Sequence, residues 1–460
     1  MFPPSEESVP LNGEVSVEPL NVLMVEGLLA LVERNWAMNY SKASRLLIGS
    51  VVVVALVSGP SLAFAKPGDL LQTFFNPTSD EGFSNSVAAV GNNVLIGAYG
   101  DSTGGANAGA AYLYDGSTGA LLRTFLNPTP AASDLFGYCV AAVGNNILVG
   151  AYGDDAGATN SGTAHLFNGS TGALLRTFLN PNPSEYASFG TSVAAVGNNI
   201  LIGADCASTG ASNSGAAYLF DDSTGALLRT FVNPTPETND LFGTSVAAVG
   251  NNIVLIGTLF DDAGAPEGGA AYIFNGSTGA LLRTFTSPTP EAFDFFSYSV
   301  AAVGNNILIG APLADVPGAA YLFDGSTGDL LQTFLGPTAE VNDFFGWSVA
   351  AVGDDVLIGS YGDDTGAADA GAAYLFDGST GALLQTFLSP TPGDNDAFGW
   401  SVAAVGNNVL VGAMGDGAGA VYMFEGIPEP ATLSLLALLA LSLPKRGGLT
   451  LLRRKSGCGG

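Results

Sequence analysis

A segment that reads SVAAVG, or CVAAVG in one copy, occurs seven times along the chain. The copies begin at residues 86, 139, 192, 245, 299, 348 and 401, so their spacings are 53, 53, 53, 54, 49 and 53 residues. A repeat of about this length is typical of β-propellers and related arrays, in which each unit is one small supersecondary structure. The repetition therefore constrains the fold more than the total length of 460 residues does.

Each unit reads, with variations, FGxSVAAVG, NNxLIGA, a loop, GAAYLFDG, STGALLRTF and NPTP. We predict four strands per unit, namely SVAAVG, VLIGA, GAAYLFD and ALLRTF. The Gly-Asn-Asn and Gly-Ser-Thr-Gly links favour tight hairpins, because Gly and Asn tolerate positive φ. Asn-Pro-Thr-Pro ends the fourth strand, because proline cannot donate to a ladder. Each unit is therefore expected to be one antiparallel sheet.

The strand count is uneven at the two ends of the repeat region. A fourth strand, Asp69 to Phe74, precedes the first SVAAVG, whereas the last unit stops after its third strand at 419–425. The N-terminal strand can therefore complete the last unit and close a ring, whereas an open solenoid would need caps at its ends. The predicted fold is an all-β, seven-bladed β-propeller of four-stranded antiparallel blades, with the N-terminal strand closing the last blade.

The chain is strongly acidic, with a formal net charge of −28. Residues 66–426 contain 5 Lys and Arg against 34 Asp and Glu. This field repels phosphate, so nucleic acid is not expected as a partner. It fits divalent cations, high salt or a solvated acidic surface. The three cysteines show no metal-ligand spacing, so a zinc site is not indicated.

The N-terminal part has the pattern of a secretory leader. Residues 38–65 combine a short basic start, an apolar stretch from Leu46 to Val57 and the cleavage pattern Ala63-Phe64-Ala65. Residues 1–37 fit no such pattern, and we interpret them as an upstream extension or a mis-called start, with Met38 as the true first residue. The propeller is assigned to residues 66–426.

The C-terminal segment 427–460 has three parts: a Pro-Glu-Pro tripeptide at 428–430, an apolar run from Leu433 to Leu443, and a basic end at 453–455. This arrangement resembles the PEP-CTERM sorting signal. The resemblance implies a Gram-negative bacterium, processing by an exosortase, transient membrane contact through the tail and an association with exopolysaccharide. Residues 444–446 interrupt the apolar run, which is short for a bilayer span.

The repeat units themselves resemble FG-GAP repeats, the blades of integrin α-subunit heads and of many bacterial surface proteins. Literal FG occurs at 136–137, 189–190, 242–243, 345–346 and 398–399, and literal GAP occurs at 310–312. The resemblance implies a seven-bladed propeller with a role in adhesion or ligand binding at the cell surface. The family's acidic calcium loop lies where this chain has only Gly-Asn-Asn, so that metal site is not carried over.

Acidic residues gather instead in the loops between the second and third strands. Gly-Asp-Asp-x-Gly-Ala occurs at 153–158 and 362–367, and a related Asp-Asp pair stands at 261–262. Carboxylates among glycines provide the oxygen ligands that Ca²⁺ prefers. Aspartate in a turn also accepts hydrogen bonds from its own backbone, which is the alternative interpretation. The calcium candidates are Asp154, Asp155, Asp261, Asp262, Asp363 and Asp364; no other cofactor is expected.

The residue just before Ser-Val breaks the sevenfold sameness of the units. In chain order it is Asn85, Tyr138, Thr191, Thr244, Tyr298, Trp347 and Trp400. An equal register places these side chains on one face of the ring, and the last three are aromatic. We hypothesise a glycan-contacting arc of Tyr298, Trp347 and Trp400. The alternative is that these rings fill space between blades or over the mouth of a central channel.

No metalloprotease or nucleotide-binding motif is present: the chain has no HExxH, no P-loop and one histidine, His165. We therefore predict a non-catalytic, secreted binding or adhesion protein of the cell surface or extracellular matrix, associated with exopolysaccharide. Its expected partners are extracellular polysaccharide or a surface protein. The alternatives are a matrix structural protein without a specific ligand, and a polysaccharide-active enzyme that uses two carboxylates.

Overall fold

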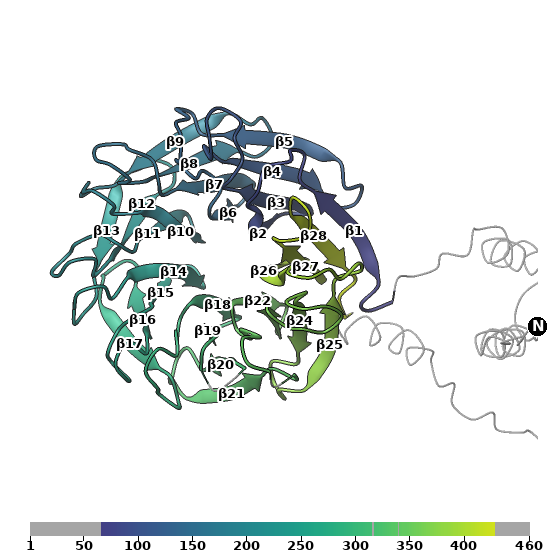
Figure 1. Cartoon of the computed structure of the whole chain (residues 1–460). Helices are drawn as coiled ribbons and strands as arrows, with labels where there is room; N and C mark the ends of the chain where they lie inside the picture. Colours follow the sequence, from purple (N-terminus) through teal and green to yellow (C-terminus); the bar gives the residue numbers. More distant parts are fainter. Residues whose placement is uncertain (1–65, 315–316, 339, 428–460) are drawn as a thin grey trace, which may run out of the picture. The chain divides into compact units, whose positions relative to one another are not determined.

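The computed structural model of the chain describes residues 66–314, 317–338 and 340–427. These residues form seven four-stranded antiparallel sheets, which stand as blades around one axis (Figure 1). The predicted all-β, seven-bladed propeller is confirmed. The expected upstream extension, the leader and the sorting tail beyond Ile427 lie outside the described residues. Within the described ranges, no helix has the length and hydropathy that a membrane span requires.

Within each blade, hydrogen-bonded strands follow one another outward from the axis, and we call them inner, second, third and outer. The inner strands are β2 (Phe83–Val90), β6 (Val140–Val143), β10 (Phe189–Val196), β14 (Phe242–Val249), β18 (Ser299–Val303), β22 (Ser348–Val352) and β26 (Phe398–Val405). The second strands are β3 (Asn93–Ala98), β7 (Asn146–Ala151), β11 (Asn199–Ala204), β15 (Ile253–Thr258), β19 (Asn306–Ala311), β23 (Asp355–Ser360) and β27 (Asn408–Ala413). The third strands are β4 (Ala110–Asp115), β8 (Thr163–Asn168), β12 (Ala216–Asp221), β16 (Ala270–Asn275), β20 (Ala319–Phe323), β24 (Ala372–Phe376) and β28 (Ala420–Phe424). The outer strands are β5 (Leu121–Leu126), β9 (Leu174–Leu179), β13 (Leu227–Phe231), β17 (Leu281–Thr286), β21 (Leu330–Leu335), β25 (Leu383–Leu388) and β1 (Leu70–Phe75).

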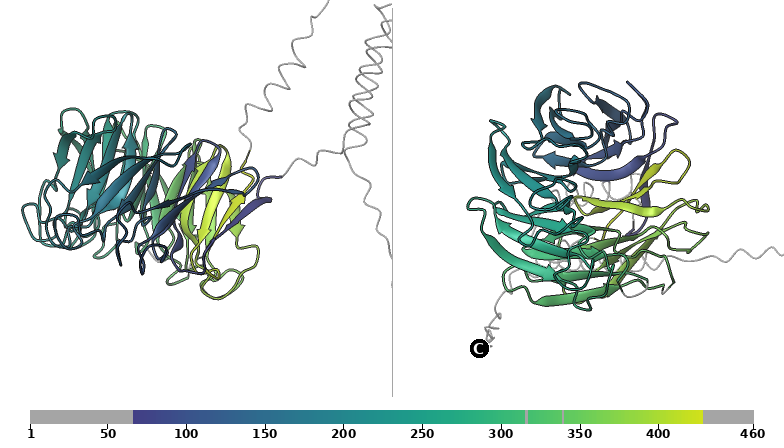
Figure 2. Two further views of the ribbon diagram at one scale, coloured as in Figure 1. Left: turned by 90° about the horizontal axis from the view of Figure 1, so that it is seen from above. Right: turned by 60° about the vertical axis from the view of Figure 1, so that its left-hand side comes forward.

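The ring has two faces, between which the strands run (Figure 2). The tight hairpins that join inner to second strands and third to outer strands lie at one face, which we call the turn face. The longer loops between second and third strands, and the links from each outer strand to the next blade, lie at the opposite face, which we call the loop face. This division follows from the antiparallel pairing of all four strands.

The core lies between neighbouring blades rather than inside one sheet. The second and third strands are buried at nearly every position, and each hydrophobic cluster joins residues of two blades. In one cluster, Leu95 and Leu113 of the first blade pack with Phe136 and Val149 of the second. Strands with apolar side chains on both faces need a neighbouring blade on each side to bury them. This explains why apolar and polar residues do not alternate in their sequences.

The FG signature marks a close contact between successive blades. Gly190 has φ +95°, and its carbonyl oxygen lies 2.1 Å from the position that a Cβ on Gly150 would occupy. The inner-strand serine or cysteine completes the contact: Ser192 Oγ donates to Gly243 O at 2.7 Å, and Cys139 Sγ donates to Gly190 O at 3.0 Å. The two recurring glycines and the recurring serine are therefore one connection between blades.

Four inner strands are longer than predicted, because they extend back to the phenylalanine of FG or, in β2, to Phe83 of the corresponding Phe-Ser. In β10 the register with β11 shifts between Phe189 and Val193. The residue after the phenylalanine has a positive φ, as at Gly190 or, in the first blade, at Ser84 with φ 70°. Such a residue bends the strand into a bulge and carries it away from the regular ladder.

The outer strands also reach the next blade. Arg176 on β9 donates to Ser223 O at 2.5 Å and to Thr224 O at 2.8 Å, both in the hairpin between β12 and β13. Gln332 on β21 makes the equivalent contact with Ser379 O at 2.9 Å. The polar residue in each of these strands therefore connects neighbouring blades at the turn face.

The ring closes where the first described strand pairs with the last. β1 is antiparallel to β28, with Thr73 opposite Tyr422 and Phe74 opposite Val421. Gly68 N donates to Glu425 O at 2.8 Å just beyond the paired strands. At the inner end of the same junction, Ser401 Oγ of the last blade donates to Ser84 O of the first at 2.6 Å. The predicted closure by the N-terminal strand is confirmed.

The two adjacent phenylalanines of β1 allow a matched test of this closure. Phe74 is buried and packs with Tyr114 at a ring-centroid distance of 5.4 Å, whereas Phe75 is 66% exposed. We expect Phe74→Ala to lower the free energy of unfolding by about 3–5 kcal/mol, as for other buried phenylalanines. Phe75→Ala should change it by about 0.5 kcal/mol or less. Denaturant unfolding followed by circular dichroism measures both; equal losses would contradict a closing role for β1.

Candidate functional site

The three predicted aromatic side chains lie side by side at the loop-face ends of the inner strands. Tyr298 and Trp347 have ring centroids 4.1 Å apart, and Trp347 and Trp400 have centroids 4.9 Å apart. All three rings are half-buried. Burial is the main cause that raises the pKa of the Tyr298 hydroxyl, so this phenol stays neutral and can donate a hydrogen bond. We call these three residues the aromatic arc.

A second layer of aromatic residues supports the arc. Tyr361, the first residue after β23, lies 4.6 Å from Trp347 and 5.0 Å from Trp400 between ring centroids. Phe344 stacks on Tyr361 with an interplanar angle of 4°. The sequence analysis missed both residues, because they lie in links whose letters vary between units. The arc is therefore held from the loop side by rings that fix its orientation.

The aromatic surface continues across the seam into the first two blades. Trp400 Nε1 donates to Asn85 Oδ1 at 3.1 Å, and Asn85 Nδ2 donates to Tyr138 O at 2.7 Å. Tyr138 then packs against Tyr152 and Tyr99 at centroid distances of 4.6 and 5.8 Å. Tyr99, Tyr138 and Tyr152 form what we call the tyrosine cluster. Aromatic or amide side chains thus follow one another over five consecutive blades.

The remaining two blades present small polar side chains at the same level. Their inner strands carry Thr191 and Thr244 where the others carry aromatic residues or Asn85. Asp205 follows β11 at the register that Tyr99, Tyr152 and Tyr361 occupy in other blades. Burial raises the pKa of Asp205 to about 6, against hydrogen bonds from Cys206 that lower it. The loop face around the axis is therefore aromatic on one side and polar on the other.

The calcium candidates lie farther from the axis, and their first aspartates accept hydrogen bonds from their own chain. Asp261 Oδ1 accepts from Ala263 N at 2.8 Å, and its Oδ2 accepts from the Tyr272 hydroxyl at 2.7 Å. Asp154 and Asp363 make the equivalent turn contacts, to Ala156 N and Thr365 N. These hydrogen bonds are the ones expected under the alternative interpretation, in which each aspartate stabilises its own turn.

The second aspartate of each candidate pair is exposed and also bonded to its own loop. Asp155, Asp262 and Asp364 accept from Asn160 N, Glu267 N and Asp369 N respectively, at 2.8, 2.5 and 2.8 Å. Across the described ranges, no group of three or more His, Cys, Asp or Glu side chains is placed to hold a metal ion. Calcium binding at these loops remains a prediction.

Each buried aspartate of these loops faces a second buried carboxylate that the sequence analysis did not single out. Asn233 Nδ2 donates to Asp240 Oδ2 at 2.7 Å and to Asp261 Oδ2 at 2.8 Å. In the same way, Thr338 Oγ1 lies 3.1 Å from Asp343 Oδ2 and 2.7 Å from Asp363 Oδ2. An amide or hydroxyl thus bridges two acids at a blade junction.

The third blade lacks both carboxylates. Alanine replaces both of them there, at Ala187 and Ala207, and both alanines join the hydrophobic cluster. The Tyr218 hydroxyl, whose equivalents donate to the aspartate in other blades, is buried there without a hydrogen-bond partner. In the second blade His165 replaces this tyrosine and reaches Asp154 through Thr163, with His165 Nε2 2.9 Å from Thr163 Oγ1. Burial lowers the pKa of His165 to about 4, so its imidazole is neutral at pH 7.

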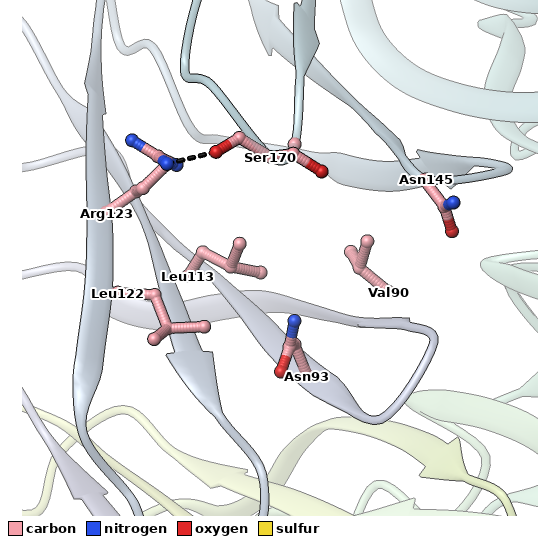
Figure 3. A pocket seen from close by; sticks show the side chains of 8 residues that line it. Val90, Asn93, Leu113, Leu122, Arg123, Asn145 and Ser170 are labelled. Atoms are coloured by element: carbon pink, nitrogen blue, oxygen red, sulfur yellow. Dashed lines mark hydrogen bonds between the residues drawn. The ribbon is translucent and has the colours of Figure 1, made fainter.

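A cleft of about 310 Å³ lies on the turn face between the first two blades (Figure 3). Leu113, Leu122 and Val90 form its apolar wall, and Asn93 and Asn145 line its polar side. Arg123 also lines the cleft and donates to the Ser170 carbonyl oxygen of the next blade (Figure 3). The guanidinium is already bonded within the protein, so this cleft is part of the connection between blades.

The buried carboxylate pairs predict how stability depends on pH. Burial, with the charges of neighbouring acids, raises the pKa of Asp134 and of Asp343 to about 6. A carboxyl group whose pKa is higher in the folded state than in the unfolded state stabilises the fold when it is protonated. This stabilisation is lost as the pH rises from the unfolded-state pKa through the folded-state pKa. We expect the melting temperature to fall between about pH 4 and pH 6.5. Thermal unfolding across this range measures it.

Two substitutions separate these pairs from other acids. Asp343→Asn removes the charge facing Asp363 and Glu340, so it should flatten this decline and stabilise the protein at pH 7 by about 1–2 kcal/mol. Asp115 is the control, because hydrogen bonds from Ser117 and Thr118 lower its pKa to about 2. Asp115→Asn should leave the decline between pH 4 and 6.5 unchanged. A parent protein whose melting temperature rises over that range would refute the assignment.

The repeated unit matches a known family in seven segments. These match the FG-GAP repeat at residues 76–114, 128–167, 178–220, 234–274, 283–323, 333–376 and 388–424. No curated protein matches the chain. Each matched segment includes the inner, second and third strands of one blade, and together the segments cover more than half of the chain. The chain therefore belongs to the FG-GAP repeat family.

Proposed function

We propose that this protein is a non-catalytic binding protein that contacts polysaccharide through the aromatic arc. The proposal rests mainly on the position of Tyr298, Trp347 and Trp400, which lie side by side near the axis of the loop face and are each partly exposed. Flat rings in a fixed orientation offer a surface on which the apolar face of a sugar can stack. A membership in the FG-GAP repeat family is consistent with ligand binding or adhesion.

The setting of this binding is part of the proposal. The leader pattern at 38–65 supports secretion, and the tail at 427–460 supports processing by an exosortase at the surface of a Gram-negative bacterium. The surface carries a large negative charge, which keeps an extracellular protein soluble. Exopolysaccharide is the partner that these signals favour, with a surface protein as the other expected partner.

Binding is favoured over catalysis by the positions of the carboxylates. A glycosidase that uses two acids needs both of them within reach of the scissile bond. Here the closest pairs, such as Asp240 with Asp261, are buried at blade junctions and accept hydrogen bonds from Asn233. A matrix structural protein without a specific ligand is the second candidate, favoured by the sameness of the seven blades.

The arc can be tested by removing its rings from the full chain. We expect Trp347→Ala and Trp400→Ala each to weaken binding to a recognised oligosaccharide by about tenfold or more, the effect of losing a central aromatic contact. Phe293→Ala is the matched control, because Phe293 is 51% exposed on the loop face but outside the arc. A glycan array, followed by calorimetry on the strongest hit, provides the measurement.

The outcome also separates the two candidate functions. A folded parent protein that binds no glycan on an array of neutral, acidic and amine-bearing oligosaccharides would favour the structural protein. A parent that binds, with both tryptophan variants binding equally well, would retain glycan binding but place it elsewhere on the ring. Circular dichroism at the assay temperature confirms that each variant is folded.

A further inference from the structure

We propose that Asp205 makes the aromatic site selective for glycans with free, protonated amines; this inference rests on the proposed glycan-binding function. The ligand class is thus an amino-sugar polymer that is at least partly deacetylated. The carboxylate would pair with the ammonium group while the aromatic arc and the tyrosine cluster contact the sugar rings. Nothing in the repeat pattern requires an acid at this position, which is occupied by Tyr, Leu, Pro or Met in the other blades.

Asp205 has an unused hydrogen-bonding atom. Its Oδ1 is buried and accepts no hydrogen bond of normal geometry among the described residues, although the thiol and amide of Cys206 lie near enough to the carboxyl group to lower its pKa. Its Oδ2 has a long contact of 3.5 Å with Thr191 Oγ1. A buried acceptor without a donor is unfavourable, and native proteins rarely leave one unless a ligand or water completes it. Because Asp205 as a whole is partly exposed, an ammonium group that approaches its carboxylate from the loop face supplies a donor and also satisfies the charge.

The carboxylate lies within electrostatic reach of the aromatic surface. The charge of Asp205 contributes to the raised pKa values of Tyr138 and Tyr152, for both of which burial is the main cause. Tyr138 is itself close enough to Tyr298 to raise the pKa of that residue. The faces of such rings attract cations, so the aromatic side of the site and the carboxylate favour the same sign of ligand charge.

The rest of the loop face also carries negative charge. The only Lys and Arg side chains of the described residues are Lys66, Arg123, Arg176, Arg229 and Arg283. The four arginines bond to turn-face hairpins, and Lys66 precedes the turn-face end of β1. The loop-face segments contain no cationic residue. They include a cleft of about 480 Å³ lined in part by Glu237, Asp262 and Glu267. This field concentrates cationic polymers and repels uronic or sulfated ones.

An organic amine fits these observations better than a metal ion does. A calcium ion takes six to eight oxygen ligands, whereas Asp205 is a single carboxylate with Thr191 beside it. An ammonium group needs one counter-charge and a few acceptors, and it gains from nearby aromatic faces. The flat rings of the arc favour a sugar as the body that carries this amine.

The test compares two oligosaccharides that differ only in their amines, with the full chain at pH 6.5. We expect calorimetry to show a β-1,4-linked glucosamine hexamer binding at least about tenfold more tightly than the N-acetylglucosamine hexamer. Asp205→Asn should abolish this preference. Asp364→Asn is the matched control, an exposed loop-face carboxylate away from the axis, and should retain the preference.

Each of the other possible binding results contradicts a different part of the proposal. Equal binding of the two hexamers, or a preference that survives Asp205→Asn, overturns the role of Asp205 while the proposed glycan binding stands. A parent protein that binds neither hexamer nor any other glycan overturns the proposed function as well. An oligolysine peptide that binds as tightly as the glucosamine hexamer, with the same dependence on Asp205, overturns the assignment to a glycan and identifies a basic peptide as the ligand.

Discussion

The structure depends on the pairing of β1 with β28. Each blade has apolar side chains on both faces of its second and third strands, so no blade can stand with an open side. Six junctions are made by blades that follow one another in the chain, and only the seventh needs the two ends to meet. Because β1 is the outer strand of the last blade, closure adds main-chain hydrogen bonds to the packing of Phe74. A ring without this strand would leave an exposed edge on β28.

The closed ring separates the positions that hold the fold from those that are free to differ. The glycine contacts and the serine bonds recur from blade to blade because each blade must fit its neighbour at a fixed distance. The residues before the inner-strand serine and after the second strand point to the axis region and meet no such constraint. Trp347, Trp400 and Asp205 occupy those positions. The proposed specificity therefore comes from a few variable positions on a repeated scaffold.

The period, the strand order and the closing strand could be predicted from the sequence, because each depends on letters that recur at a fixed spacing. The residues of the aromatic arc could be singled out for the same reason. They differ from the residues at the same position of the other repeats, and such a difference is visible only where the repeats align. Tyr361 and Asp205 were missed because their neighbours in the loops vary. The carboxylate pairs were missed too: Asp240 and Asp261 belong to different segments of a unit, and only the folded link brings them to Asn233. The Asp-Asp motif alone does not reveal whether its oxygens are already bonded.

The most direct test of ring closure is to supply the closing strand from outside. A chain that lacks residues 66–75 should unfold at a lower temperature, and its β28 amides should exchange with deuterium faster than those of β12, the third strand of a blade without a seam. Adding a peptide of residues 66–76 should restore both the melting temperature and the protection of β28. If the truncated chain keeps the parent's melting temperature and the peptide has no effect on exchange, the ring does not depend on this strand.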